Sequence, residues 1–595
     1  MKIVLVSINA KYIHSGLAIR YLASYCAGDF PHIELKEFHI NEPVETIIAE
    51  IYRLRPTVVG FSCYIWNIEY VLKVVDTLGQ LLPDLVVILG GPEASFSGEE
   101  LLVQHPAVSY VIAGEGEEAF RALLQALTAG KEDLGYIPGL YWRKNGEVRC
   151  NGGYQEIQDL DTIPSPYVKE LDDLEHKLVY LETSRGCPYR CSYCLSSISR
   201  QVRFFSLDRV KADMKRLIDA GVPQVKMIDR SFNWPKERAR EIWRFIAEHS
   251  HQTAFHFEIR PDLLEEEDLS FLAQMPPGIL QFEIGIQSTN PQTIKAIQRN
   301  MVIDKALEAI RRLAQAGNIH LHVDLIAGLP YEDLKSFAKS FDDVFSTGPQ
   351  RIQVGFLKLL PGSRMRQEAA TMDYLYTRFP PYEIMQSDAM SYEDLLMVKD
   401  VEHLVELYYN SKRFSHSLAL ANHLWGSAFA FFRDFAQYWR ERSYFSYGHK
   451  MRKLYDIFLD FFHRKQPTVT DLAVEVLKFD FLLSEGKMGL PASLSPYGCK
   501  ESRARFRELC ASEDYLKAYL PELVGYSSRE INKRIRIERF EYKVSTLSPR
   551  TPWAYPESGS EMICFDYAQR HPVTGYAKWT VLPEANSCSH GGDWD

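Results

Sequence analysis

Short apolar runs alternate with longer amphipathic stretches over the first 130 residues. The apolar runs are rich in Val and Ile, and their length suits buried strands. Between them, stretches such as 68–82 repeat apolar residues at helical spacing. Strands that alternate with helices indicate parallel βαβ units, so we expect a doubly wound, Rossmann-like sheet over residues 1–130.

The pattern changes three times after residue 130. Residues 131–175 have hairpin character around a turn-like Lys-Asn-Gly-Glu, and we expect a connector there. Six strand-like runs alternate with helical patterns over 176–375, which predicts a partial (β/α)6 barrel whose chemistry lies at the carboxyl ends of its strands. Residues 380–595 repeat aromatic residues at helical spacing and then carry two strand-like runs, so a mostly α-helical C-terminal region is expected. The predicted fold class is therefore α/β.

Composition narrows the function classes. The formal net charge is −10 over 595 residues, which disfavours broad nucleic-acid binding, although a local basic patch stays open. The sequence has no apolar run of eighteen residues, and its start does not read as a signal peptide. Ten cysteines in a chain of this size do not indicate a disulfide framework. We expect a cytoplasmic protein with no membrane partner.

Three of the ten cysteines lie together directly after a predicted strand. Cys187, Cys191 and Cys194 are spaced C-x3-C-x2-C. Thiolates suit zinc or iron–sulfur clusters, but a closed structural zinc site normally needs four ligands. Three thiolates leave one iron of a 4Fe–4S cluster without a protein ligand. Zinc with a remote fourth ligand, or free thiols, is the alternative.

With Tyr193 directly before the last cysteine, this motif resembles the signature of the radical S-adenosylmethionine (SAM) superfamily. The resemblance implies a 4Fe–4S cluster that cleaves SAM to a 5′-deoxyadenosyl radical, with an electron from a flavodoxin or ferredoxin. It also implies SAM contacts from polar residues at barrel strand ends, namely Asp229, Ser231, Glu258, Arg260 and Gln287, with Gly285 and Ser288 beside the last of these. The family's usual Gly-Gly-Glu is absent from 227–233, and Glu258 with Arg260 fits a strand-end ion pair equally well. Gly328 and Pro330 are expected to shape turns.

A doubly wound domain before such a barrel resembles the cobalamin-binding subfamily of radical SAM proteins, over about residues 1–370. The resemblance implies a cobalamin at the carboxyl edge of the sheet. The contacts implied there are Ser62, Gly90, Gly91, Gly114 and Glu115. Residues 11–16 lack the Asp-x-His-x-x-Gly found in many cobalamin domains, so whether His14 ligates cobalt stays open. The alternative is a domain that has lost its cofactor and only packs on the barrel. No Gly-x-Gly-x-x-Gly loop is present, which disfavours NAD and FAD.

The resemblance implies an enzyme, a methyltransferase acting on an unactivated carbon of an unknown substrate. Two alternatives stay open: radical rearrangement or cyclisation without methyl transfer, and a non-catalytic cobalamin or SAM sensor. A methylthiotransferase is disfavoured because such enzymes usually carry three further cysteines in the first domain, where only Cys26 and Cys63 occur.

The C-terminal region resembles an extension found on some proteins of this subfamily. Its aromatic residues between Phe414 and Phe462 are expected to pack a core. Basic residues between Arg529 and Arg539 alternate with glutamates, so a solvated face is expected. Two ligand types near the C-terminus, Cys588 and His590, do not make a metal site.

Overall fold

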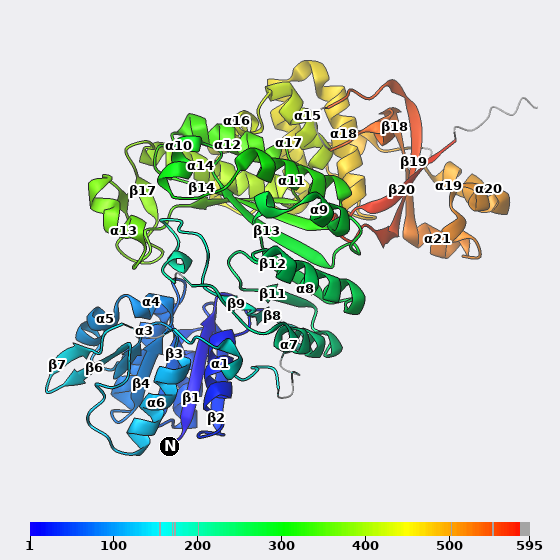
Figure 1. Ribbon diagram of the computed structural model, residues 1–595. Helices are drawn as coiled ribbons and strands as arrows, with labels where there is room; N and C mark the ends of the chain where they lie inside the picture. The colour runs from blue at the N-terminus through cyan, green and yellow to red at the C-terminus, as the bar shows by residue number, and fades with distance from the viewer. Residues whose placement is uncertain are drawn as a thin grey trace, which may run out of the picture. The chain divides into compact units, whose positions relative to one another are not determined.

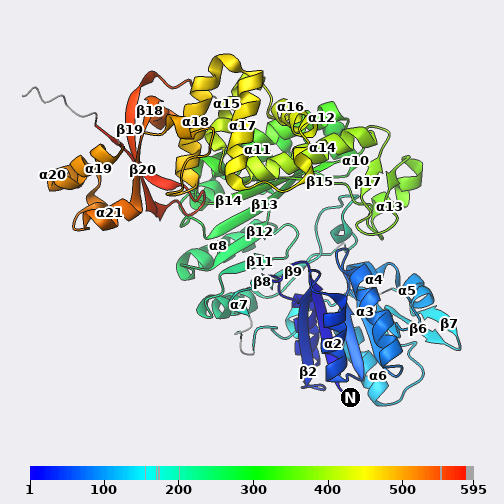
Figure 2. The same ribbon diagram turned by 180° about the vertical axis from the view of Figure 1, so that it is seen from behind.

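The computed structural model describes residues 1–153, 156–168, 171, 174–199, 201–500, 502–549 and 553–583 (Figure 1 and Figure 2). The chain divides into two compact units. The first unit comprises residues 1–309, 326–333 and 355–392, and the second comprises 310–325, 334–354 and 393–595. The α/β fold class expected from the sequence is confirmed, because parallel sheets with intervening helices precede a mostly helical region.

The first unit begins with a seven-stranded sheet of order β2-β1-β3-β4-β5-β6-β7, blue to cyan in Figure 1. Strands β1 to β5 are parallel, whereas β6 and β7 pair antiparallel. The hairpin expected in the connector therefore extends this sheet. The strands are β1 (Ile3–Asn9), β2 (Ile33–His39), β3 (Val58–Ser62), β4 (Val86–Gly90), β5 (Tyr110–Ile112), β6 (Leu140–Lys144) and β7 (Glu147–Cys150). The helices are α1 (Leu17–Cys26), α2 (Val44–Leu54), α3 (Ile68–Leu81), α4 (Pro92–Ser95), α5 (Gly98–Gln104) and α6 (Glu117–Thr128).

Side chains of this sheet alternate between two apolar cores, as successive residues of a strand must. One core joins Val59 and Val87 to α2 and α3. The other joins Val58 and Ile88 to α1 and α6. Because both faces are covered by helices, the strands read as continuous apolar runs.

The barrel contributes a six-stranded sheet of order β15-β14-β13-β12-β11-β8, so all six predicted strands form. The pairs from β8 to β13 are parallel. The strands are β8 (Leu178–Leu181), β11 (Gln224–Met227), β12 (Ala254–Glu258), β13 (Leu280–Gln287), β14 (His320–Ala327) and β15 (Arg351–Phe356). A short antiparallel pair, β9 (Ser184–Arg185) and β10 (Arg203–Phe204), follows β8. The helices are α7 (Leu207–Asp219), α8 (Lys236–His249), α9 (Glu266–Leu272), α10 (Pro291–Ala296), α11 (Ile303–Ala316) and α12 (Leu334–Phe345). Smaller elements follow β15, namely α13 (Arg364–Glu368), β16 (Leu375–Tyr376) and β17 (Ile384–Gln386).

The second unit is mostly helical, as expected, and ends in a three-stranded antiparallel sheet that contains the two expected strands and one further strand. The aromatic residues from Phe414 to Phe462 pack against one another in its core, as in the contacts of Phe435 with Trp439 and Phe461. The helices are α14 (Tyr392–Leu404), α15 (Ser415–Trp425), α16 (Ala428–Glu441), α17 (Met451–Lys465), α18 (Thr470–Ser484), α19 (Ser502–Ala511), α20 (Glu513–Tyr519) and α21 (Ser528–Arg534). The strands are β18 (Ile535–Tyr542), β19 (Ser558–Arg570) and β20 (Ala577–Leu582).

Helix α18 is buried on every side from Leu472 to Leu483. It nevertheless carries charged residues, each of which is paired. Lys478 contacts Glu475 at 2.8 Å, and Asp480 contacts His416 Nδ1 at 2.7 Å. Buried charges are tolerated when they are paired and hydrogen-bonded, so these groups are explained by the core itself.

The basic stretch near residue 534 is partly neutralised by ion pairs, while Arg529 and Lys533 are exposed. Arg534 pairs with Asp566, and Arg536 pairs with Glu538 at 2.6 Å. Cys588 and His590 lie outside the described residues. Within the described part of the chain, no helix is both long and apolar enough to cross a membrane.

Candidate cofactor sites

A cavity of about 410 Å³ opens at the carboxyl ends of β3 and β4 in the first unit. It lies on the side of the sheet covered by α1 and α6, where Val58 and Ile88 belong to the core. Alternation along the strands brings Gly60, Ser62 and Gly90 to this same side. Toward the strand ends, the side chains on this face become smaller. The space that larger side chains would fill is the cavity. Its size is within the range of about 300–1,000 Å³ that is typical of small-molecule sites.

The adjacent glycines Gly90 and Gly91 serve different purposes. A Cβ at Gly90 would meet only Ile112 O, at 3.7 Å, so nothing in the protein itself fills that space. Gly91 has φ of 105°, and a Cβ there would lie 2.6 Å from Cys63 O. The backbone therefore requires glycine at 91, whereas at 90 glycine leaves room for a ligand.

The other residues predicted for the first domain also line this cavity. Ser62, Gly114 and Glu115 lie along its wall with the two glycines. His14 is not among the lining residues, and its ring Nδ1 lies 2.7 Å from the hydroxyl of Tyr180.

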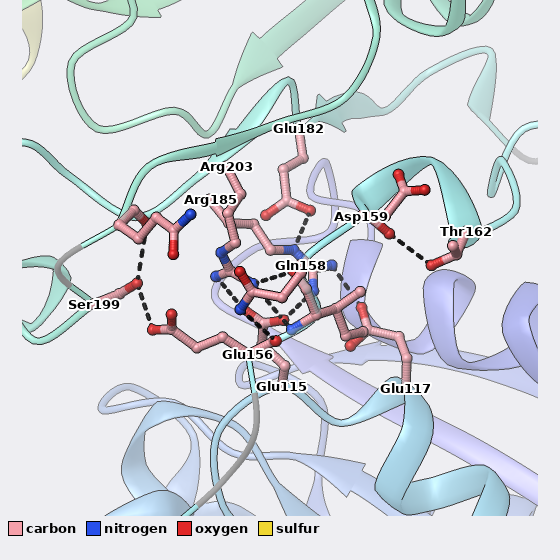
Figure 3. Close-up of polar contacts among 12 residues, drawn as sticks. Glu115, Glu117, Glu156, Gln158, Asp159, Thr162, Glu182, Arg185, Ser199 and Arg203 are labelled. Carbon is pink, nitrogen blue, oxygen red and sulfur yellow. Dashed lines mark hydrogen bonds and ion pairs between the residues drawn. The ribbon is translucent and has the colours of Figure 1, made fainter.

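The cavity continues to the loop that follows β8, where a cluster of buried charges lies (Figure 3). Arg185 contacts Glu117 at 2.6 Å, Glu182 at 3.0 Å and Glu115 at 3.3 Å. Arg203 contacts Glu115 at 3.1 Å. These three carboxylates and two guanidinium groups link the loop after β5 and the start of α6 to the end of β8 and the β9–β10 pair.

The carboxylates of this cluster differ in their pKa values. Burial raises the pKa of Glu182 to about 7. Burial also acts to raise the pKa of Glu115, but its hydrogen bond from Arg203 and the charge of Arg185 hold that pKa below the usual value. The two carboxylates therefore stay in different protonation states over part of the physiological range.

The cysteine motif follows this cluster directly. Gly186, with φ of 94°, turns the chain so closely that a Cβ there would lie 2.4 Å from Gln201 O. Cys187 Sγ lies 3.8 Å from Ser231 Oγ, and Arg299 Nη1 donates to Cys191 Sγ at 3.6 Å. Arg299 Nη1 also donates to the hydroxyl of Tyr193 at 3.0 Å.

The donor set of the motif consists of three thiols on one segment, those of Cys187, Cys191 and Cys194. The cysteines are free thiols, and burial raises the pKa of Cys187. Soft thiolates on one loop, with a guanidinium donating to Cys191, fit the Cys ligation of an iron–sulfur cluster.

Two of the residues predicted to contact SAM already make hydrogen bonds or ion pairs with other residues of the protein. Asp229 is buried and accepts hydrogen bonds from Thr183 N at 3.0 Å and from Thr183 Oγ1 at 2.6 Å, so it ties β11 to the end of β8. Arg260 is buried and pairs with Asp262 at 2.7 Å, and its guanidinium lies 3.9 Å from the ring centre of Tyr189. Arg260 thus forms a strand-end ion pair, although with Asp262 rather than with Glu258.

The remaining predicted residues keep polar atoms available. Glu258 makes a long contact, 3.4 Å, with Arg230. Gln287 has φ of 72°, in the left-handed region, and its buried Oε1 has no hydrogen-bond partner within the described structure. An orphaned buried acceptor is rare, and it favours a polar ligand beside β13. Gly285 accommodates the side chains of Gln287 and Arg299, Ser288 Oγ donates to a buried glutamate, and Gly328 and Pro330 lie in the turn after β14.

Sequence reasoning missed several residues of these sites. Arg185, Glu182 and Arg203 carry no motif, and only burial at the cavity reveals them. Arg299 lies more than 100 residues after the cysteine that it contacts. Gly60 could have been found, because it lies two residues before Ser62 and therefore on the same face of a strand.

Sequence profiles of three families match successive parts of the chain. The B12 binding domain matches residues 3–124, the radical SAM superfamily matches 181–344, and the family described as protein of unknown function (DUF4080) matches 370–558. The cobalamin-dependent radical SAM methyltransferase TokK of Streptomyces tokunonensis is 27% identical over 351 residues, 55% of this chain and 51% of TokK. The 2-(S-pantetheinyl)-carbapenam-3-carboxylate methyltransferase of Streptantibioticus cattleyicolor is 26% identical over 448 residues, 68% of this chain and 65% of that enzyme. This chain thus spans about half to two thirds of the length of these relatives.

A solved structure shares the fold. The cobalamin-dependent SAM radical enzyme OxsB, with aqua-cobalamin bound, aligns with a TM-score of 0.56 at 16% identity over 81% of this chain and 79% of OxsB. The fold, the cavity beside Gly90 and the cysteine motif define a radical SAM protein with a B12-binding domain. The chain thus carries a B12-binding domain, a radical SAM domain and, after the barrel, a DUF4080 domain, and the relatives that it resembles are radical SAM methyltransferases.

Proposed function

We propose that this chain is a cobalamin-dependent radical SAM methyltransferase that modifies an unactivated carbon of its substrate. The observation that carries the proposal is the continuous cavity wall. It runs from Gly90 in the B12-binding domain to Arg185 and Gly186, next to Cys187. A ligand in this cavity therefore touches the loop that carries the cysteines.

The residues present fit both cofactors. We assign the cluster to Cys187, Cys191 and Cys194, and a buried part of cobalamin to the space beside Gly90. When bound, the cluster supplies the electron that cleaves SAM to a 5′-deoxyadenosyl radical, and the corrinoid supplies a methyl carrier.

The protein's own residues hold this arrangement. Arg185 ties the start of the cysteine loop to Glu117 at the N-terminus of α6, so the two domains of the first unit are joined at the cofactor cavity. For SAM, we assign Glu258 and Gln287 as contacts, since their polar atoms remain available. We also assign Ser231, whose Oγ donates to Arg230 O at 2.8 Å and can still accept a hydrogen bond. Asp229 and Arg260 position the loops around them.

Two further assignments belong to this proposal. An electron donor of the flavodoxin or ferredoxin class reduces the cluster. The described cysteines are all free, which fits the reducing interior of a cell, and we place the protein in the cytoplasm.

The test is product analysis with SAM labelled in its methyl group. Anaerobic turnover with candidate substrates should give 5′-deoxyadenosine, S-adenosylhomocysteine and a product that carries the labelled methyl. Turnover that gives 5′-deoxyadenosine but never S-adenosylhomocysteine would contradict methyl transfer and favour a rearrangement or cyclisation. The absence of both products with every reductant would favour a sensor.

A further inference from the structure

The second unit contains a cavity of its own, of about 300 Å³, that is unrelated to the cofactor residues. We call it the basic pocket. Five segments line it: the last turns of α11, the end of α12 with the loop 346–350, the segment 409–418 that runs into α15, Pro549, and the turn 574–576 between β19 and β20. None of the residues assigned to the cluster, SAM or cobalamin lines it. The radical chemistry therefore does not account for this pocket.

The described ionisable side chains that line the basic pocket carry positive charge only, apart from the hydroxyl groups of its tyrosines. Among the residues of the described chain that line the pocket, Arg311 and Lys412 are cationic and none is acidic. Hydroxyl and amide side chains lie beside them, including Gln315, Ser415 and Thr574. Phe345 and Tyr409 add an aromatic wall, with ring centres 5.2 Å apart. Cations, neutral donors and rings without carboxylates are the composition expected of a site for an organic anion.

Lys412 is the group that most needs a partner. Its Nζ donates to Val573 O at 2.7 Å, and in the described structure no carboxylate lies within 4.0 Å of it as an ion pair. An ammonium group has three donors, so a single carbonyl leaves its hydrogen-bonding capacity partly unused. Burial lowers the pKa of Lys412. An oxyanion in the pocket would compensate this charge.

The backbone is unusual where it delivers these side chains. Residues Val405–Tyr409 form a π-helical turn, and Lys412 has φ of 62°, in the left-handed region. Both features are uncommon in a non-glycine segment and cluster at functional sites. Tyr409 Oη donates to Pro349 O, and Tyr576 Oη donates to Lys412 O at 2.6 Å. The strained turn is thus held in place from two sides.

We propose that the basic pocket binds a small organic anion, whose carboxylate or phosphate head pairs with Lys412 and whose apolar body packs on Phe345 and Tyr409. The volume admits a small metabolite and excludes a large cofactor. Binding there is independent of the cluster and of cobalamin, so this proposal does not rest on the proposed function.

The experiment uses the full chain, reconstituted with its cofactors, and isothermal titration with phenyl phosphate, benzoate and inorganic phosphate. Lys412→Met should weaken binding of the preferred organic probe at least about tenfold, whereas Lys412→Arg should keep most of it. Lys465→Met, at an exposed position, is the matched control and should bind as the wild type does. A preference for phenyl phosphate or for benzoate identifies the head group. Equal binding by Lys412→Met and the control, or no binding of either organic probe by the wild type, would overturn the proposal.

A second measurement needs no variant. An amine-reactive reagent should label Lys412, and saturating phenyl phosphate or benzoate should slow that labelling while leaving Lys465 unchanged, as read by peptide mass spectrometry. Labelling of Lys412 that is indifferent to both probes would overturn the proposal, and so would protection by inorganic phosphate equal to that by phenyl phosphate.

Discussion

Gly90 offers a way to fill the corrinoid cavity without disturbing the fold. A Cβ at Gly90 meets only Ile112 O, at 3.7 Å, so Gly90→Val is expected to fold. Glycine inside a strand costs about 0.5–1 kcal/mol relative to alanine, so the unliganded variant should be at least as stable as wild type. The added methyl groups occupy space that the ligand needs. Overpacking of that kind costs about 1–3 kcal/mol, which corresponds to about 5- to 150-fold weaker cobalamin binding.

The assay is equilibrium binding of hydroxocobalamin by absorbance, with thermal unfolding measured on the same unliganded samples. Gly28→Val, at an exposed glycine with nothing within 4 Å, is the matched control and should bind normally. Gly91→Ala should instead lower the unfolding temperature, because its Cβ would lie 2.6 Å from Cys63 O at a positive φ. Normal cobalamin binding by a folded Gly90→Val protein would refute the assignment of this cavity.

Four further predictions concern the residues around the cysteines. Cys191→Ala should abolish 5′-deoxyadenosine formation, whereas a sensor would keep its ligand binding unchanged. Arg299→Met removes a cation that donates to Cys191 Sγ, so the reduction potential of the cluster, measured by redox titration, should fall. For a charge at about 4 Å the fall is at most about 170 mV. The fall should be smaller in Arg299→Lys, which keeps the positive charge. Arg203→Met leaves Glu115 buried with one partner fewer and should lower the free energy of unfolding, measured in urea, by about 3–5 kcal/mol. A decrease smaller than about 1 kcal/mol would contradict the structural role of Arg203. The pKa of Glu182 is raised to about 7 in the folded protein, above its unfolded value of 4.5, so its contribution to stability is complete below about pH 4.5 and is lost as the pH rises through 7. Urea unfolding should therefore show a decline of up to about 3 kcal/mol over that range relative to Glu182→Gln, and parallel pH profiles would contradict the raised pKa.

Much of the fold follows from the sequence, since strand and helix periodicity are local properties. The run Leu280–Gln287 alternates buried and half-buried residues and forms β13 where it was expected. Residues Ile535–Tyr542 were interpreted only as a basic-leaning stretch, yet they form β18. Their charges conceal the strand, because Arg536 and Glu538 pair with each other along it.

The candidate site likewise contains residues that a local sequence pattern predicts and residues that it does not. The cysteine motif and the Gly90–Gly91 pair are contiguous in sequence, so a local pattern was enough to predict a cofactor role for each. The cluster around Arg185 is assembled from segments more than 60 residues apart, and no local pattern records it. Asp229 stays a predicted SAM contact, and the hydrogen bonds that its oxygens accept from Thr183 and Ser184 could not be foreseen from its position at a strand end.

The central claim is that one chain holds a cluster and a corrinoid at separate residues. The most direct test is anaerobic reconstitution with iron, sulfide and hydroxocobalamin, followed by desalting and an absorption spectrum. A variant with alanine at Cys187, Cys191 and Cys194 is compared with the wild type. We predict a retained corrinoid band in both proteins and cluster absorbance in the wild type alone. Cluster absorbance without any retained corrinoid in the wild type would contradict the account, because the cavity beside Gly90 would then hold something else.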